Sequence, residues 1–268
     1  MTRILIPTDM SEGSRKAVLF ALDAYGIAET EFIFLLTIGD APKMGLFPEF
    51  NNHMKRLAQG ELDVLTAEIR ALHPGKTLHL DTVVGTGSVF AAVQEYTGAD
   101  PVDLVVMGTR GEGGALRWGS NAEVVSRNST GPVIVVPPDW EAGPIKKILY
   151  ADDQEEVRDP KTLVPLVRLA KRYGAGVEFV HVMKEGEPTG PVPTLPPFPK
   201  VFQGIPCTSS STVGSDVTES LERSLDTGKY GILAVLHRRL GWLDGLFHRS
   251  VAKRMALNTT VPLLVMYE

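Results

Sequence analysis

The chain alternates between short apolar runs and longer stretches that carry apolar residues at helical spacing. The short runs are apolar almost throughout, which is typical of strands buried on both faces of a parallel sheet. In the first half they cover residues 3–7, 32–38, 78–84, 104–107 and 133–136. The stretches between them predict helices over residues 11–25, 51–72, 88–97 and 120–128, the first with Ser11 as N-cap. This order predicts an α/β fold with an open, mostly parallel sheet, whose ligands bind at the carboxyl ends of the strands.

The second half of the chain repeats the first. Residues 4–9 and 33–38 match residues 148–153 and 177–182 at an offset of 144, whereas residues 132–136 match 262–266 at an offset of 130. The offset falls after the second strand of the copy, so the second copy has lost about one helix there. We therefore expect two tandem domains, residues 1–140 and 145–268, joined by a stretch rich in proline. Residues 188–199, with six prolines, are expected to replace the lost helix with an extended loop.

Two strand ends in the first half carry residues suited to a phosphate ligand. Glycines let a backbone approach an anion closely, and a helix start offers unpaired N–H groups. Asp9 could accept a hydrogen bond from a ribose or an adenine amine, or help to hold a metal ion. A tight turn followed by a helix cap explains the same glycines without any ligand, and glycine counting alone does not separate the two. The residues concerned are Pro7, Thr8 and Asp9 after the first strand, then Gly108 and Gly111, and Gly119 and Ser120 at the start of a helix.

These residues together resemble the universal stress protein family. The resemblance extends over the whole chain as a tandem pair and is stronger over residues 1–140. It implies two Rossmann-like units, each with an open, mostly parallel five-stranded sheet flanked by helices. It also implies an adenine nucleotide, ATP or AMP with Mg²⁺, bound by members that keep a Gly-x2-Gly-x9-Gly-(Ser/Thr) motif. This chain has Gly108-x2-Gly111-x7-Gly119-Ser120, two residues shorter. The resemblance further places Ile38 against the base and adds Gly85 and Met107 as weaker candidates.

The second copy does not keep the motif. His237, Leu240 and Arg249 stand where the first copy has Gly108, Gly111 and Gly119, and Ser250 alone matches. We therefore expect a degenerate, structural second domain without a nucleotide. The basic and aromatic residues 237–250 fit either a repacked loop or a different anion or partner site.

Composition narrows the class of protein. The 268 residues include 27 Lys and Arg against 32 Asp and Glu, a net charge of −5, which argues against broad nucleic-acid binding. No apolar run approaches the length of a membrane-spanning helix, and residues 1–14 do not form a signal peptide. The single Cys207 excludes a disulfide within the chain. These features predict a cytoplasmic protein.

The resulting expectation is a stress-response protein that binds an adenine nucleotide in its first domain as a regulatory ligand. It would be at most a weak ATPase, because no general base is identifiable at the site. The apolar last strands, residues 132–136 and 262–266, are expected to pair and make the chain a pseudo-dimer, and two chains could pair further. The first alternative is a nucleotide-free scaffold for an unidentified protein partner. The second is an enzyme or anion-binding protein, for which Asp9 and His237 are the available side chains.

Overall fold

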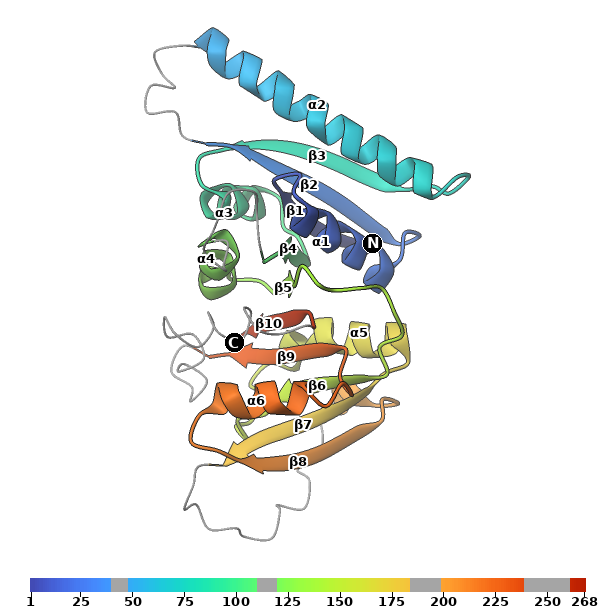
Figure 1. Cartoon of the computed structure of the whole chain (residues 1–268), viewed down its shortest axis with the longest axis vertical. Helices are drawn as coiled ribbons and strands as arrows, with labels where there is room; N and C mark the ends of the chain where they lie inside the picture. The colour runs from blue at the N-terminus through green and yellow to red at the C-terminus, as the bar shows by residue number, and fades with distance from the viewer. Residues whose placement is uncertain (40–47, 110–119, 184–198, 239–260) are drawn as a thin grey trace. The chain divides into compact units, whose positions relative to one another are not determined.

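The computed structural model describes residues 1–39, 48–109, 120–183, 199–238 and 261–268 (Figure 1). These residues form two compact units, Met1–Ser129 and Thr130–Glu268. Both units combine helices with mostly parallel strands, so the predicted α/β fold class is confirmed. No helix in the described part of the chain is long and apolar enough to cross a membrane.

Parallel strands in the order β3-β2-β1-β4 form the sheet of the first unit. The interior of β1 is fully buried at Ile4, Leu5 and Ile6, which explains why its sequence is apolar on both faces. Because β2 and β4 flank β1 on opposite sides, the strand order reverses at β1. The strands are β1 (Thr2–Thr8), β2 (Thr30–Ile38), β3 (His79–Thr86) and β4 (Leu104–Gly108).

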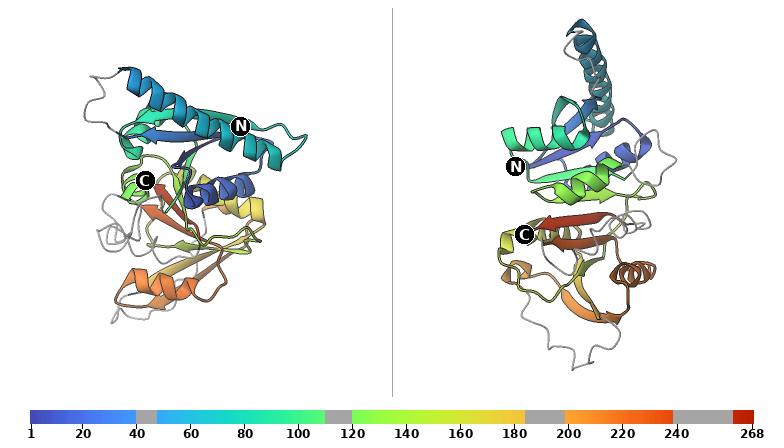
Figure 2. Two further views of the ribbon diagram at one scale, coloured as in Figure 1. Left: turned by 45° about the horizontal axis from the view of Figure 1, so that its top comes forward. Right: turned by 90° about the vertical axis from the view of Figure 1, so that its left-hand side faces the viewer.

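The helices of this unit begin and end where local chemistry dictates. Helix α1 (Glu12–Tyr25) starts after Ser11, whose Oγ accepts a hydrogen bond from Ser14 N at 3.3 Å, as the sequence predicts. It ends at Gly26, whose φ of 68° suits glycine. The right-hand view of Figure 2 shows α1 and α3 on opposite sides of the strands. The other helices are α2 (Pro48–Leu72), α3 (Val89–Ala99) and α4 (Ser120–Asn128).

Six strands make up the sheet of the second unit, in the order β5-β10-β9-β6-β7-β8. Strand β5 runs antiparallel to β10, with Val135 opposite Leu263, and the other neighbours are parallel. The predicted pairing of the last strands of the two copies is thereby confirmed. The strands are β5 (Val133–Val136), β6 (Lys147–Ala151), β7 (Gly176–Met183), β8 (Cys207–Val213), β9 (Ile232–His237) and β10 (Leu263–Tyr267).

Between β7 and β8, the described residues of the second unit show an aromatic contact where the first unit has a long helix. Between β7 and β8 the described residues contain only the short 3₁₀ helix η3 (Lys200–Phe202), where the first unit has the 25-residue α2. Phe202 is buried and packs edge-on against Phe179 of β7, with ring centres 5.3 Å apart. The proline-rich residues 184–198 lie outside the described part of the chain. Helices α5 (Val164–Tyr173), preceded by η2 (Pro160–Leu163), and α6 (Val217–Leu225) complete the unit.

Gly108→Ala should destabilise the chain by about 1–3 kcal/mol, the usual range for overpacking a close contact. A Cβ at this position would lie 2.5 Å from the backbone oxygen of Gly13, and backbone cannot move aside cheaply. Urea unfolding measures the change. The matched control is Gly98→Ala in α3, where nothing lies within 4 Å and the loss of a helical glycine should raise stability by up to about 1 kcal/mol. Equal effects of the two substitutions would contradict the close approach at Gly108.

Candidate functional site

The turn after β1 is held by side chains that the sequence marks as candidates. Thr8 Oγ1 accepts a hydrogen bond from Met10 N at 3.1 Å. Asp9 Oδ1 accepts from Ser11 N at 3.1 Å and from Ser11 Oγ at 2.5 Å. These bonds hold Met10 at a φ of 64°, a left-handed conformation that is uncommon outside glycine. The turn directs the chain from β1 into α1 and leaves Asp9 exposed.

The second unit builds the same turn after β6. Asp152 Oδ1 accepts from Gln154 N and Asp153 Oδ1 accepts from Glu155 N, both at 3.1 Å. Gln154 has a φ of 60°, matching Met10 at the repeat offset of 144. The two copies thus share a backbone conformation as well as a sequence pattern.

Gly108 brings the end of β4 against the first turn of α1. Strands β1 and β4 are parallel neighbours, with Leu5 opposite Val105, so their carboxyl ends lie side by side. The space beside Gly108 is filled by the backbone of Gly13 and Ser14. The glycine at this position is therefore explained by strand–helix packing, whether or not a phosphate also lies there.

A buried hydroxyl at the same strand ends is left unpaired. Thr109 is 4% exposed, and its Oγ1 has no hydrogen-bond partner among the described residues. A buried polar atom without a partner costs free energy, so a ligand that accepts or donates a hydrogen bond there would be stabilising. Nearby, Thr8 Oγ1 donates to Ser14 Oγ at 3.0 Å. Thr109 and Ser14 were not among the residues predicted from the sequence, although the repeat aligns Thr109 with Arg238 and is a signal that could have found it.

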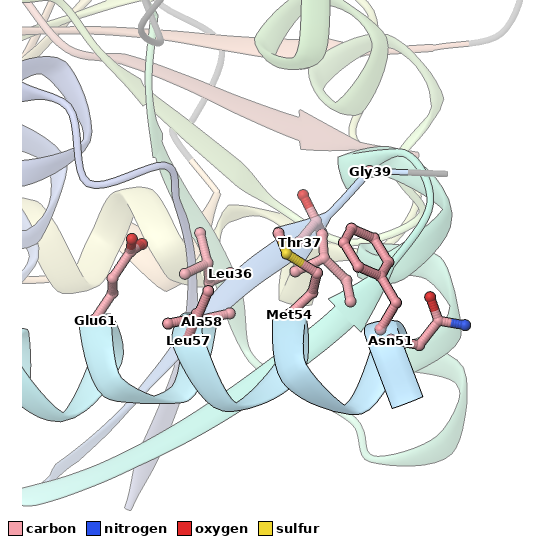
Figure 3. Close-up of a pocket in the computed structure, with 10 residues that line it drawn as sticks. Leu36, Thr37, Gly39, Asn51, Met54, Leu57, Ala58 and Glu61 are labelled. Atoms are coloured by element: carbon pink, nitrogen blue, oxygen red, sulfur yellow. The ribbon is translucent and has the colours of Figure 1, made fainter. Parts of the chain in front are cut away.

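Ile38 lies in a pocket of about 520 Å³ between the end of β2 and α2 (Figure 3). The pocket volume is in the range of small-molecule sites. Leu36 and Ile38 contribute from β2, and Met54 and Leu57 from α2, so most of its wall is apolar. Thr37, Asn51 and Glu61 are the polar side chains at the pocket. The lining does not include Pro7, Thr8 or Asp9, so the pocket and the β1 turn are separate parts of the candidate site.

The remaining candidates lie on β3, β4 and α4 or beyond the described residues. Met107 is buried in β4. Gly85 lies on β3, two strands from β1, and a Cβ there would come within 2.8 Å of Ala92 Cβ, so packing against α3 explains this glycine. Gly111 and Gly119 lie outside the described residues, and Ser120 is the first residue of α4. Among the described residues no group of three or more His, Cys, Asp or Glu could hold a metal ion.

In the second unit an arginine fills the corresponding position. The Arg238 side chain is 8% exposed and contacts three carboxylates: Nη1 lies 3.0 Å from Asp153 Oδ2 and 2.9 Å from Glu155 Oε2, and Nε lies 2.9 Å from Glu268 Oε2. Its Nη2 also donates to the backbone oxygens of Glu155 and Glu156 at 3.2 Å. Asp153, the counterpart of the exposed Asp9, is thus buried and paired with the Arg238 guanidinium.

The helix after this turn is displaced to make room. At the repeat offset, Glu12 corresponds to position 156, whereas the helical segment begins at Pro160, four residues later. Glu268 Oε1 accepts hydrogen bonds from the backbone N–H groups of Arg158 and Asp159. These bonds hold the longer segment between the turn and the helix in place. His237, at the position of Gly108, packs edge-on against Tyr267 with ring centres 5.7 Å apart.

Burial determines the electrostatics of the second turn. Burial raises the pKa of Asp152 and of Asp153, and the positive charge of Arg238 opposes both shifts. Burial would lower the pKa of Arg238, but the carboxylates of Asp153 and Glu268 hold it above its ordinary value. His181 Nδ1 of β7 lies 2.9 Å from the backbone oxygen of Asp152.

Comparison with known proteins now decides the family. The model of the universal stress protein family matches residues 1–137. The chain belongs to the universal stress protein family. A search of curated protein sequences finds no significant match.

Solved structures extend the likeness of this universal stress protein through both units. The crystal structure of a universal stress protein from Archaeoglobus fulgidus DSM 4304 covers 99% of this chain and 96% of its own, with a TM-score of 0.70 and 18% identity. A protein from Pseudomonas aeruginosa UCBPP-PA14, described as a putative universal stress protein, covers 100% and 93%, with a TM-score of 0.64 and 12% identity. At these identities the likeness shows the fold.

Arg238→Ala should destabilise the chain by about 3–5 kcal/mol, because it leaves Asp153 and Glu268 buried without a cation. Denaturant unfolding measures the loss. Lys229→Ala removes a positive charge at an exposed position of the same unit and should change stability by less than about 0.5 kcal/mol. An Arg238 variant as stable as the Lys229 variant would show that the buried ion cluster contributes nothing.

Asp152→Asn should stabilise the chain more at about pH 8 than at about pH 4. The folded chain holds the pKa of Asp152 above its ordinary value through burial, so ionisation of this carboxyl costs stability as the pH rises through that raised pKa. Asparagine avoids that cost and can keep the acceptor for Gln154 N. Unfolding free energies of the variant and the wild type at both pH values test this. Asp139→Asn, at an exposed position, controls for the loss of one negative charge, and a gain for Asp152→Asn that is larger at low pH would contradict the sign of the shift.

Proposed function

We propose that the first domain binds an adenine nucleotide at the carboxyl ends of β1, β2 and β4, and that the second domain is structural. The observation that carries the proposal is the contrast between the two copies. The same turn follows β1 and β6, but Asp9 is exposed in the first copy, whereas Asp153 is sealed by Arg238 in the second. In this proposal the domains keep the limits of the sequence copies, residues 1–140 and 145–268.

The place of the turn in the sheet favours a ligand. In open α/β sheets ligands bind where the strand order reverses, and that point lies at β1, between β2 and β4. Exposed Asp9 offers an acceptor for a ribose hydroxyl or an adenine amine. The unpaired Thr109 Oγ1 offers a further polar contact at the end of β4.

The other parts of the ligand are assigned by chemistry. The apolar wall of the pocket at Ile38 suits a flat base. Pro7 lies near the carboxyl end of β1 and Met107 near the carboxyl end of the neighbouring strand β4. Gly108, Gly111, Gly119 and Ser120 would lie towards the phosphates, because the N–H groups at the start of α4 favour an anion. Mg²⁺ would arrive with the polyphosphate and neutralise part of its charge. Gly85 contributes to this domain through packing against α3.

The nucleotide would act as a regulatory ligand in a stress response. A bound ligand stabilises the state that binds it, so occupancy can report the nucleotide level without turnover. Arg238 would prevent the same occupancy in the second domain, because its guanidinium already satisfies Asp153. One nucleotide per chain is therefore expected.

Asp9→Asn should weaken adenine-nucleotide binding by about tenfold or more, the usual effect of losing a hydrogen bond to a charged group. The asparagine oxygen can still accept from Ser11 N, so the turn and α1 should remain folded. Isothermal titration calorimetry of the full chain with ATP, ADP and AMP, with and without Mg²⁺, gives the affinity and the stoichiometry. Gly119→Val should abolish binding at the phosphate end, and Asp139→Asn is the matched control.

The outcomes separate the two halves of the proposal. Two nucleotides per chain would contradict the sealed second site. Unchanged binding by Asp9→Asn would contradict the assignment of the β1 turn. Wild-type protein that binds none of the nucleotides would overturn the proposal and favour the nucleotide-free scaffold.

A further inference from the structure

Helix α2 has two apolar faces: one is buried against its own sheet, and the other is half-exposed, with Phe50 and Leu57 at the edge of the pocket at Ile38. Ala58, Leu62, Leu65 and Ile69 follow each other at steps of four, three and four residues and are buried. Figures 1 and 2 show α2 running along β2 and β3, where this face packs. A helix that only covers a sheet needs no second apolar face.

The outer face carries large apolar side chains at seven-residue intervals. Phe50, Leu57 and Val64 are 54%, 52% and 55% exposed. Three positions after each of them come His53, Gly60 and Ala67, all exposed. Positions repeating at three and four residues form the contact line of paired helices, so we call these six residues the outer line of α2.

The large and small residues of the outer line are complementary to those of a second copy that runs in the opposite direction. When two such helices pair antiparallel, the positions of Phe50, Leu57 and Val64 in one helix pack beside the positions of His53, Gly60 and Ala67 in the other. With Leu57 beside Gly60 of the second copy, Phe50 falls beside Ala67 of the second copy and Val64 beside His53 of the second copy. Each large side chain therefore meets a smaller one or the flat imidazole ring, which lets the helices approach closely.

The charges on one edge of the line fit the same register. Glu49, Arg56 and Asp63 directly precede Phe50, Leu57 and Val64. Arg70 follows at the same seven-residue interval, and the four charges alternate in sign. In the antiparallel register Glu49 faces Arg70 of the second copy, and Arg56 faces Asp63 of the second copy. All four facing pairs along this edge then have opposite charge. On the other edge Met54 of each copy faces Glu61 of the other copy. Each of these two pairs contains a single charge, so neither is repulsive.

We propose that two copies of this chain associate through the outer lines of their α2 helices, packed antiparallel. The occupant of this face is a second copy because the register that interlocks the side chains also satisfies the charges under a two-fold axis near residue 59. A two-fold axis makes every contact occur twice, so a self-complementary surface is what a homodimer requires. The interface uses residues of the first unit only. Phe50 and Leu57 also line the pocket at Ile38, so the interface borders the pocket proposed for the base.

A parallel pair does not fit the same surface. It would place Asp63 opposite Glu68 of the second copy, which are like charges, and would stack Gly60 on Gly60 and Ala67 on Ala67, which leaves gaps beside the large residues. Glu68 is also engaged within its own chain by an ion pair with Arg15 of α1. Asp63 accepts a hydrogen bond from Gln59 at 2.9 Å through Oδ1, and a carboxylate can accept further bonds, so this contact is compatible with Arg56 of the second copy.

Sedimentation velocity of the full chain from about 1 to about 200 µM tests the proposal, because a single helix pair is a small interface of modest affinity. The wild type should show a reversible monomer–dimer equilibrium, and Leu57→Glu should remove the dimer. Arg56→Glu and Asp63→Arg should each weaken the dimer by about tenfold, because each turns two attractive pairs into repulsive ones. The double variant should recover wild-type affinity within about threefold, because the pairs are attractive again.

Lys55→Glu is the matched control, since it makes the same charge reversal one residue away on α2 and should leave the dimer unchanged. Thermal unfolding followed by circular dichroism establishes that each variant is folded. A wild type that stays monomeric over the whole range would overturn the proposal. So would a dimer that survives Leu57→Glu and both charge reversals, and an Asp63→Arg variant that associates more strongly would show parallel pairing instead.

Discussion

The close approach of the end of β4 to the first turn of α1 shapes the candidate site of the first unit. Gly108 has no Cβ, and this lets the backbone of Gly13 lie where a side chain would otherwise stand. With α1 drawn in this far, Ser11 and Ser14 reach the end of β1 and bond to Asp9 and Thr8. The polar turn, the exposed Asp9 and the start of the helix are all placed by one short contact between two glycines.

The second unit lacks that contact and is rebuilt around a cation. His237 replaces Gly108, and the helix begins four residues later relative to the repeat. The extra residues wrap around Arg238, which binds the backbone oxygens of Glu155 and Glu156. Glu268 then holds both the guanidinium and the backbone N–H groups of the wrapping segment. Asp153 keeps its role in the turn while its second oxygen is committed to a cation, so the strand end becomes part of the core.

Among the described residues of the second copy no helix matches α2, and Phe202 packs against β7 there. A helix without a described counterpart in the other copy can carry a surface of its own. Its buried face packs against β2 and β3, whereas Phe50, Leu57 and Val64 on the other face recur every seven residues, the spacing of paired helices. Fold stability and association would then be encoded on separate faces of one helix.

In the first half of the chain, the alternation of apolar runs and helical periods predicted the bounds of the helices and strands to within about three residues. Strands buried on both faces and capped helices leave strong local patterns in the sequence. Ser11 was readable as a cap, and the repeat predicted the pairing of β5 with β10. The sequence also marked the turn at Thr8 and Asp9, and His237 as the residue in place of Gly108. It did not reveal that Gly108 and Gly85 are glycines because backbone or Ala92 fills the space beside them, since this depends on segments brought together only in the folded chain. Nor did it reveal that Arg238 closes the second site, because Asp153, Glu155 and Glu268 lie 85, 83 and 30 residues from it along the chain and meet it only through the parallel order of β6, β9 and β10.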